Sequence, residues 1–184
     1  MGRLFAILAG LILVASPCWA ASSADMQQVM ETVTGFYQVH QASTQDGVPD
    51  TKQRSKYEQF ISPELDTLLS DGDAAEALYA KRNPDSPPMV EGDLFSPNFE
   101  GISFFKIGHC AEIKSSVKCK VELRYVDPHP PPQDKPVQWV DTVTLVETAS
   151  GWRVDDIAYG GTWDFGNHGT LKGLLKDVIA DASK

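Results

Sequence analysis

The residues best suited to chemistry lie together in one stretch near the C-terminus, residues 155–168. The stretch reads Asp-Asp-Ile-Ala-Tyr-Gly-Gly-Thr-Trp-Asp-Phe-Gly-Asn-His. It offers carboxylates, a phenol and an imidazole, which are groups that general acid–base catalysis uses. The same groups, together with an aromatic ring, also suit the binding of a ligand or a partner. The candidate binding residues are Tyr159, Trp163, Asp164 and His168.

A structural interpretation of this stretch is favoured over a catalytic one. Strict alternation along a strand would place Val154 and Ile157 on opposite faces. A β-bulge at Asp155 and Asp156 would return Ile157 to the core and free a carboxylate to accept backbone N–H bonds. Glycines then permit tight turns toward the last helix. Residues 160–168 are therefore predicted to form a loop, which would carry the functional surface if the protein has one.

Cys110 and Cys119 are predicted to form a disulfide. Two thiols close to each other usually pair in an oxidising compartment. Their residue numbers add up to 229, as do those of Lys114 and Ser115, so a turn at Lys114 and Ser115 places the cysteines opposite each other. Only His109 lies nearby as a further metal ligand, whereas a structural zinc site needs four ligands. No metal site is predicted.

The register that pairs the cysteines has a difficulty upstream. It turns Phe105 and Ile107 away from the core and places Lys106 on the apolar face. A bulge at Gly108-His109 would restore both apolar side chains to the core and leave the cysteines paired. The sequence therefore predicts a bulged strand next to the disulfide.

The first twenty residues have the features of a secretory signal peptide. Arg3 supplies the positive charge, an apolar run follows, and cleavage is predicted after Ala20. The remaining residues, 21–184, are predicted to form one domain, and their net charge is −10 because the chain's −9 loses Arg3. The apolar run is too short to span a bilayer, and Pro17 disfavours a lipid anchor at Cys18. The expectation is a periplasmic or secreted acidic protein without a transmembrane anchor, for which nucleic acid is an unsuitable partner.

Apolar spacing predicts three helices in the first half of the chain. The first covers residues 25–42 and buries one stripe that extends to His40. Gly35 costs this helix about 1 kcal/mol relative to alanine, so a close neighbour or a bend is expected there. A polar connection, residues 43–53, follows.

The second and third predicted helices share a less regular segment. A helical region begins near Ser55, and Ser62-Pro63 restarts it as N-cap and first residue. Asp71-Gly72-Asp73 is predicted to interrupt this helix. Residues 74–82 would then form a third short helix with Leu78 facing inward.

Alternation predicts four antiparallel strands, and a final helix follows them. The strands cover residues 102–111, 117–125, 137–148 and 152–159. A loop with five prolines, residues 127–136, joins the two hairpins. The last helix, from the cap Thr170 to about Ala182, has a leucine stripe that should dock on the body of the domain. Helices followed by strands predict an α+β fold with helices packed on one face of a curved sheet.

Two stretches and the helix trio resemble a known group of proteins. Asp93-Leu94-Phe95-Ser96 at the entry to the sheet and residues 151–157, Gly-Trp-Arg-Val-Asp-Asp-Ile, look like secreted bacterial domains of unknown function. Those domains are grouped with the nuclear-transport-factor-2-like (cone-shaped, cystatin-like) superfamily. The resemblance covers about residues 26–178 and implies a curved sheet that wraps a helix to make a conical cavity. The helix after the last strand departs from the plainest members and would cover the mouth of the cone.

The resemblance leaves the function open, because the superfamily includes enzymes, ligand binders and interaction modules. Its ketosteroid-isomerase-like members use Asp and Tyr inside the cone. The resemblance therefore implies, as one alternative, Asp156 or Asp141 facing inward with Tyr159 or Tyr125. That alternative is a cone-fold isomerase, dehydratase or hydrolase, and it requires a carboxylate with a raised pKa in an apolar pocket.

The expected function is a non-enzymatic binding module for a protein partner or a small ligand. The motifs of nucleophile-elbow hydrolases, P-loop proteins, zinc proteases and dinucleotide-binding enzymes do not occur in the sequence. No cofactor is predicted. A toxin-neutralising protein or an accessory protein of the envelope would fit export, acidity and the predicted fold.

Overall fold

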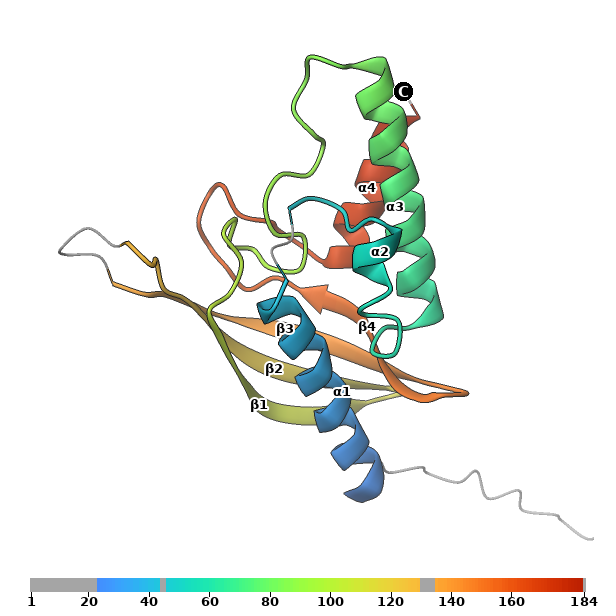
Figure 1. The fold of residues 1–184 in the computed structure, drawn as a ribbon. Coiled ribbons are helices and arrows are strands. Elements are labelled where there is room, and N and C mark those ends of the chain that lie inside the picture. The colour runs from blue at the N-terminus through green and yellow to red at the C-terminus, as the bar shows by residue number, and fades with distance from the viewer. Residues whose placement is uncertain (1–22, 44–45, 130–134, 184) are drawn as a thin grey trace, which may run out of the picture.

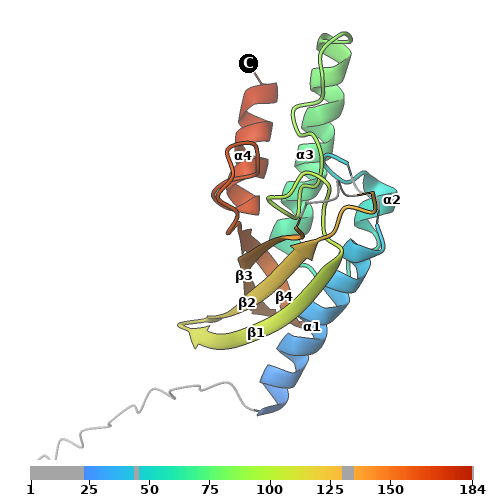
Figure 2. The same ribbon diagram turned by 90° about the vertical axis from the view of Figure 1, so that its left-hand side faces the viewer.

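A curved, four-stranded antiparallel sheet with helices beside it confirms the predicted α+β fold. The computed structural model describes residues 23–43, 46–129 and 135–183. Figure 1 shows α1 lying against one face of the sheet, with α3 and α4 side by side next to β4. The same arrangement is seen from the side in Figure 2, where the curved sheet lies beside α1. The predicted signal peptide lies outside the described residues.

The described elements follow the predicted order of helices, then four strands, then a final helix. In chain order they are α1 (Ser23–Gln41), α2 (Thr51–Arg54), α3 (Pro63–Arg82), β1 (Phe104–Ile113), β2 (Ser116–Tyr125), β3 (Val137–Thr148), β4 (Gly151–Ala158) and α4 (Leu171–Ala182). The strand order is β1-β2-β3-β4, so each strand pairs with its neighbours in sequence. Among the described helices, none has the length and apolarity that crossing a membrane requires.

The first helix makes a close contact at Gly35 with the turn segment that precedes α3. A Cβ atom at this position would overlap Cε1 of Phe60. The aromatic ring therefore occupies the space that any larger residue would need. This contact confirms the close neighbour that the sequence predicted, and the apolar stripe of α1 is fully buried at Val29, Val33, Phe36 and Tyr37.

The predicted start of the second helix is wrong. Residues 55–60, expected to be helical, form turns, and the short helix α2 lies before them, inside the stretch predicted as a polar connection. Asp50 and Gln53 form a capping box that begins α2 early: each side chain accepts from the other residue's backbone N–H. The residues after Ser55 form turns, from which Tyr57 is fully buried in the core.

The predicted break at Asp71-Gly72-Asp73 is also wrong, because α3 continues through it to Arg82. Gly72 is buried where α3 meets α4, and a Cβ there would lie 3.0 Å from Cδ2 of Leu175. Close packing between the helices thus offsets the low helix propensity of glycine, about 1 kcal/mol. Leu78, expected to face inward, is 40% exposed.

The bulge and the disulfide predicted in the first hairpin are both confirmed. Ile107 pairs with Val121 and Cys110 pairs with Cys119, so the register shifts at the two residues between Ile107 and Cys110. The disulfide joins Cys110 to Cys119 directly across β1 and β2. The shift lets the turn place the cysteines opposite each other while Ile107 still packs against the core.

The second predicted bulge is confirmed in β4. Thr144 pairs with Asp156 and Leu145 pairs with Val154, which leaves Asp155 as the extra residue. Ile157 is fully buried as a result. Val154 and Ile157, which precede and follow Asp155-Asp156 in β4, are thus both buried.

The two edges of the sheet differ. At β4, Ser62 donates its backbone N–H to the carbonyl of Val154 at 2.8 Å, and Val154 donates to the carbonyl of Phe60 at 2.8 Å. The segment that leads into α3 therefore covers this edge. The other edge is β1, and no isolated bridge joins it to another segment among the described residues.

Candidate functional site

A buried polar pair, His40 and Asp93, joins the C-terminal end of α1 to residues 92–101. Nε2 of His40 lies 2.5 Å from Oδ2 of Asp93, and the two residues are only 3% and 4% exposed. Oδ1 of Asp93 accepts the backbone N–H of Phe95 at 2.8 Å. The ring of Phe95 packs edge-on against His40, with 5.7 Å between ring centroids. Contacts within the protein therefore hold both residues of the pair in place: the Phe95 N–H bonds to Asp93, and the Phe95 ring packs against His40.

An open pocket of about 440 Å³ lies over this pair. Its size falls in the range of small-molecule sites, about 300–1,000 Å³. The carboxylates of Asp46, Asp93 and Glu100 line it, and no Lys or Arg of the described residues does. Phe99 adds an aromatic ring to the wall and is 55% exposed. The pocket is accordingly acidic on one side and apolar on another.

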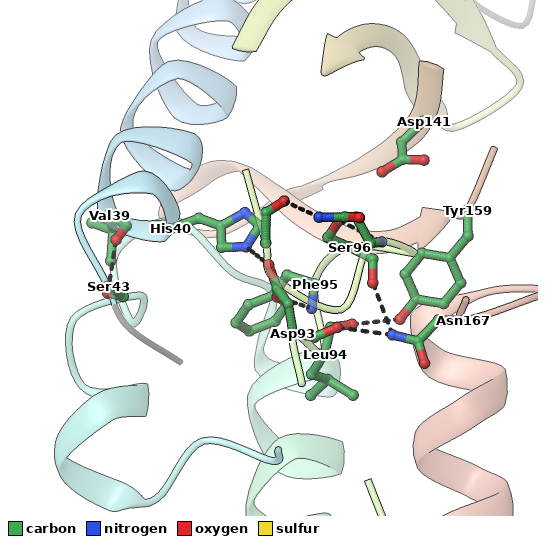
Figure 3. A network of polar contacts seen from close by, with 12 residues as sticks. Val39, His40, Ser43, Asp93, Leu94, Phe95, Ser96, Asp141, Tyr159 and Asn167 are labelled. Atoms are coloured by element: carbon green, nitrogen blue, oxygen red, sulfur yellow. Dashed lines mark hydrogen bonds and ion pairs between the residues drawn. The ribbon is translucent and has the colours of Figure 1, made fainter. Parts of the chain in front are cut away.

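The predicted functional loop, residues 160–168, is fastened to the same segment (Figure 3). Nδ2 of Asn167 donates to the carbonyls of Asp93 and Ser96, each at 2.8 Å. The hydroxyl of Tyr159 donates to the carbonyl of Leu94 at 2.6 Å. Residues 92–101 are thus held by α1 on one side and by this loop on the other.

The four candidate binding residues have different surroundings. Tyr159 is half-buried and its hydroxyl is engaged. Trp163 is half-buried as well: its indole packs edge-on against Trp139 at 5.6 Å and its N–H donates to the carbonyl of Pro97 at 3.2 Å. Asp164 and His168 are exposed. The loop therefore offers a fixed base with two solvated polar side chains.

Sequence reasoning missed the residues that connect this loop to the pocket. Asn167 resembled an ordinary loop residue, because no local pattern marks an amide that bonds to carbonyls about seventy positions away. Phe165 was also missed, although it is 97% exposed. Its position in a predicted loop, between the polar Asp164 and Gly166, was the feature of the sequence that could have indicated an exposed ring.

The carboxylates considered for catalysis accept backbone hydrogen bonds. Oδ1 of Asp141 accepts from the N–H of Gly160 at 2.8 Å, and Oδ2 accepts from the Trp139 indole at 3.2 Å. Oδ1 of Asp156 accepts from the N–H of Lys172 at 3.0 Å, which caps α4. Within the described chain, neither carboxylate lines the pocket at His40.

Asp141 nevertheless has one property of a catalytic acid. It is fully buried, and this burial raises the pKa of its carboxyl from 3.8 to about 6, against the opposing effect of its two hydrogen bonds. Burial raises the pKa of Tyr159 well above its usual value, and the charges of Asp93 and then Asp141 raise it further. Tyr125, the other phenol that the resemblance implied, lines a different pocket.

A serine, a histidine and an aspartate meet at the pocket, yet they do not form a nucleophilic triad. Such a triad requires a hydrogen bond between the serine hydroxyl and the imidazole. The hydroxyl of Ser43 donates instead to the carbonyl of Val39 at 2.8 Å (Figure 3). Nδ1 of His40 has no partner among the described residues. The three residue types are near one another without the contact that would activate the serine.

The raised pKa of Asp141 predicts that the protein loses stability as pH rises through about 6. The folded state keeps the carboxyl protonated up to that pH, while the unfolded chain ionises near 3.8. The stabilising effect is complete below pH 3.8 and is lost between pH 4 and 6. One pKa unit corresponds to about 1.4 kcal/mol, so the charged carboxylate costs the folded state roughly 3 kcal/mol above pH 6.

Urea denaturation at pH 4, 5, 6 and 7 measures this effect. Asp141→Asn should become more stable relative to the wild type as pH rises, because the amide does not ionise. Asp177→Asn removes an exposed carboxylate from α4 and provides the matched control. Parallel stability curves for the wild type and Asp141→Asn would contradict the prediction.

The candidate site combines an open acidic pocket, the buried pair beneath it and the loop fastened alongside. Most of its polar atoms bond to one another or to the backbone, which suits a fixed surface better than proton transfer. Comparison with protein-family models and with curated proteins found no significant match to the sequence.

Proposed function

We propose that this protein is an exported, non-enzymatic binding module of the bacterial envelope. Its partner is a protein that docks on the rim formed by residues 92–101 and 160–168, which we call the docking rim. The observation that carries the proposal is the exposure of Phe99 and Phe165, one in each of two loops that hydrogen bonds from Asn167 join, with Phe99 also lining the open pocket. Large apolar side chains exposed on a protein surface, aromatic rings above all, are typical of interaction surfaces.

Both loops of the docking rim are held in place, so they can present these rings without first becoming ordered. Asn167 bridges them through two hydrogen bonds, and the Trp163 indole adds a third at Pro97. A surface that is already fixed loses less conformational entropy when a partner binds. This rigidity supports protein binding over a loop that closes on a substrate.

The signal-like N-terminus and the disulfide support export, since disulfides persist in oxidising compartments. A curved sheet with a helix against its face also fits the nuclear-transport-factor-2-like resemblance. Neutralisation of a toxin or assistance to another envelope protein would require only such a surface. The rival proposal, a cone-fold enzyme, is supported by the raised pKa of Asp141, but the oxygens of this carboxylate already accept two hydrogen bonds.

Affinity capture with surface variants tests the proposal. The exported form, residues 21–184, is immobilised and exposed to the envelope fraction of the source cells. We expect a specific envelope or secreted protein to be retained, and Phe99→Ser/Phe165→Ser to reduce its retention at least tenfold. Leu78→Ser is the control, because Leu78 is 40% exposed on α3 away from the docking rim.

Thermal melting of each variant verifies that folding is intact. Equal retention by the docking-rim variant and the wild type would reject the proposal. An equal loss with Leu78→Ser would reject it too, since the captured protein would then be adhering to exposed apolar side chains in general.

A further inference from the structure

We propose that the Cys110–Cys119 disulfide is a redox switch that selects between two registers of the hairpin formed by β1 and β2. When oxidised, it holds the tip of the hairpin in the register described above. When it is reduced, the tip of β1 slips by one residue against β2. The slip changes which side chains the tip displays on the outer face of the sheet, the face away from α1. The inference goes beyond the docking rim and does not depend on it.

The two halves of β1 pair with β2 in registers that differ by one residue. Ile107 pairs with Val121, and unbroken pairing from that point would place Cys110 opposite Lys118. Cys110 lies opposite Cys119 instead, which leaves an extra residue of β1 in the bulge. β1 is also an edge strand (Figure 1), so among the described strands it pairs with β2 alone. Its tip can therefore change register without disturbing a second neighbour.

The side chains at the tip fit the unbroken register better than the observed one. Directly opposed residues of an antiparallel pair share a face. Glu112 lies opposite Val117, which is fully buried, whereas Ile113 lies opposite Ser116 and is 46% exposed. A slip of one residue exchanges the faces. It turns Glu112 outward, brings Ala111 opposite Val117, and moves Ile113 from the strand into the loop.

The turn of the observed hairpin is strained at Lys114. This register closes through Lys114 and Ser115, and Lys114 has a φ of 59°, in the left-handed region that favours glycine. In the unbroken register Glu112 pairs with Ser116, so the loop has three residues, another common hairpin length. The bulge, the turn and the faces at the tip thus favour the slip, while His109, which would turn inward, opposes it.

Reduction requires an external dithiol, and the two cysteines differ in access. Cys119 is fully buried and Cys110 is half-buried, so the thiolate of the dithiol attacks Sγ of Cys110. The S–S bond breaks, Cys119 leaves as a thiolate that takes up a proton, and a mixed disulfide forms at Cys110. The second thiol of the reductant then displaces Cys110. Two electrons pass to the protein, each cysteine becomes a thiol, and the reductant becomes a disulfide.

The slip separates the two thiols once they have formed. Sγ of Cys110 lies 3.7 Å from Sδ of Met30 in the observed register, on the face toward α1. In the unbroken register Cys110 lies opposite Lys118 and points to the outer face. Reoxidation then requires the tip to slip back, so the hairpin is the two-state element that the redox state biases.

NMR of the isotope-labelled exported form, residues 21–184, with and without dithiothreitol tests the switch. In the oxidised form we expect cross-strand contacts between Ala111 and Lys118, and in the reduced form between Ala111 and Val117. Lys106 and Glu122 should stay opposed in both forms, because that half of β1 does not move. Unchanged contacts at Ala111 would overturn the proposal. The loss of all cross-strand contacts beyond the bulge would overturn it too, since the tip would then be unfolded rather than shifted.

A relocated cysteine tests the second register without reduction. His109→Cys/Cys110→Ser places the thiol at the position that faces Cys119 only after the slip. We expect a disulfide with Cys119, whose equilibrium constant against dithiothreitol stays within about tenfold of the wild-type value. Lys106→Cys/Cys110→Ser is the control, because position 106 faces outward in both registers, and it should keep two free thiols. Thermal melting verifies that both variants fold. Free thiols in the first variant, or a disulfide in the control, would reject the two-register model.

Discussion

Asp93→Ala is expected to lower the free energy of unfolding by about 2–6 kcal/mol, because two buried groups, the His40 ring and the Phe95 N–H, each lose a hydrogen-bond partner at a cost of about 1–3 kcal/mol. The substitution leaves the imidazole of His40 buried with neither ring nitrogen bonded to a described group. It also removes the acceptor of the Phe95 N–H, which helps to hold the turn at the start of residues 92–101. Chemical denaturation at neutral pH measures the loss.

Asp93→Asn is the control for this substitution. The amide keeps one oxygen, so it can satisfy either His40 or the Phe95 N–H, and the loss should be clearly smaller than for alanine. A double-mutant cycle with His40→Ala should show a coupling energy above about 0.5 kcal/mol, as contacting residues do. Additive losses, or a loss below about 1 kcal/mol for Asp93→Ala, would show that the pair contributes little to stability.

Leu175→Ala should destabilise the protein by about 2–5 kcal/mol, because Leu175 is fully buried between α4 and α3. In a chain of this length, 1 kcal/mol corresponds to roughly 2–4 °C in Tm, so thermal melting should detect it easily. Truncation removes contacts at Gly72, where α3 has no side chain of its own to fill the space. The result would be a cavity along the contact of the two helices.

Leu174→Ala is the matched comparison, since it removes the same atoms from the neighbouring position of the same helix. Leu174 is only half-buried, so its loss should be well under half that of Leu175→Ala. Equal losses would indicate that α4 docks in another orientation. An unchanged Tm in both variants would mean that the helix does not contribute to the folded core.

Local patterns in the sequence predicted much of the fold. The two bulges follow from positions where strict alternation conflicts with the apolar residues Ile107 and Ile157, and both occur. The disulfide follows from turn position and residue numbering alone. The N-caps Ser62 and Thr170 begin their helices as expected. Each of these features depends on residues close together in the chain or opposed across one turn.

The errors concern features whose cause lies far away in the sequence. Gly72 appeared to be a helix breaker, because nothing near it reveals that Leu175 packs against that position. His40 appeared to be one more member of an apolar stripe, while its partner Asp93 is 53 residues away. The loop at residues 160–168 could be predicted from its glycines, but its attachment to residues 92–101 could not. Periodicity detects faces of helices and strands, whereas isolated polar contacts leave no repeat in the sequence.

The unequal edges of the sheet limit how copies of this protein can join through their backbones. Pairing between sheets requires a free row of N–H and C=O groups on both strands. The edge at β4 already bonds to Phe60 and Ser62, so in the part of the chain that the structure describes β1 is the edge left for another strand. Two chains that met edge to edge at β1 would each have used that edge and could recruit no third. Growth into a ribbon, which needs a free edge on both sides of every chain, stops at a pair.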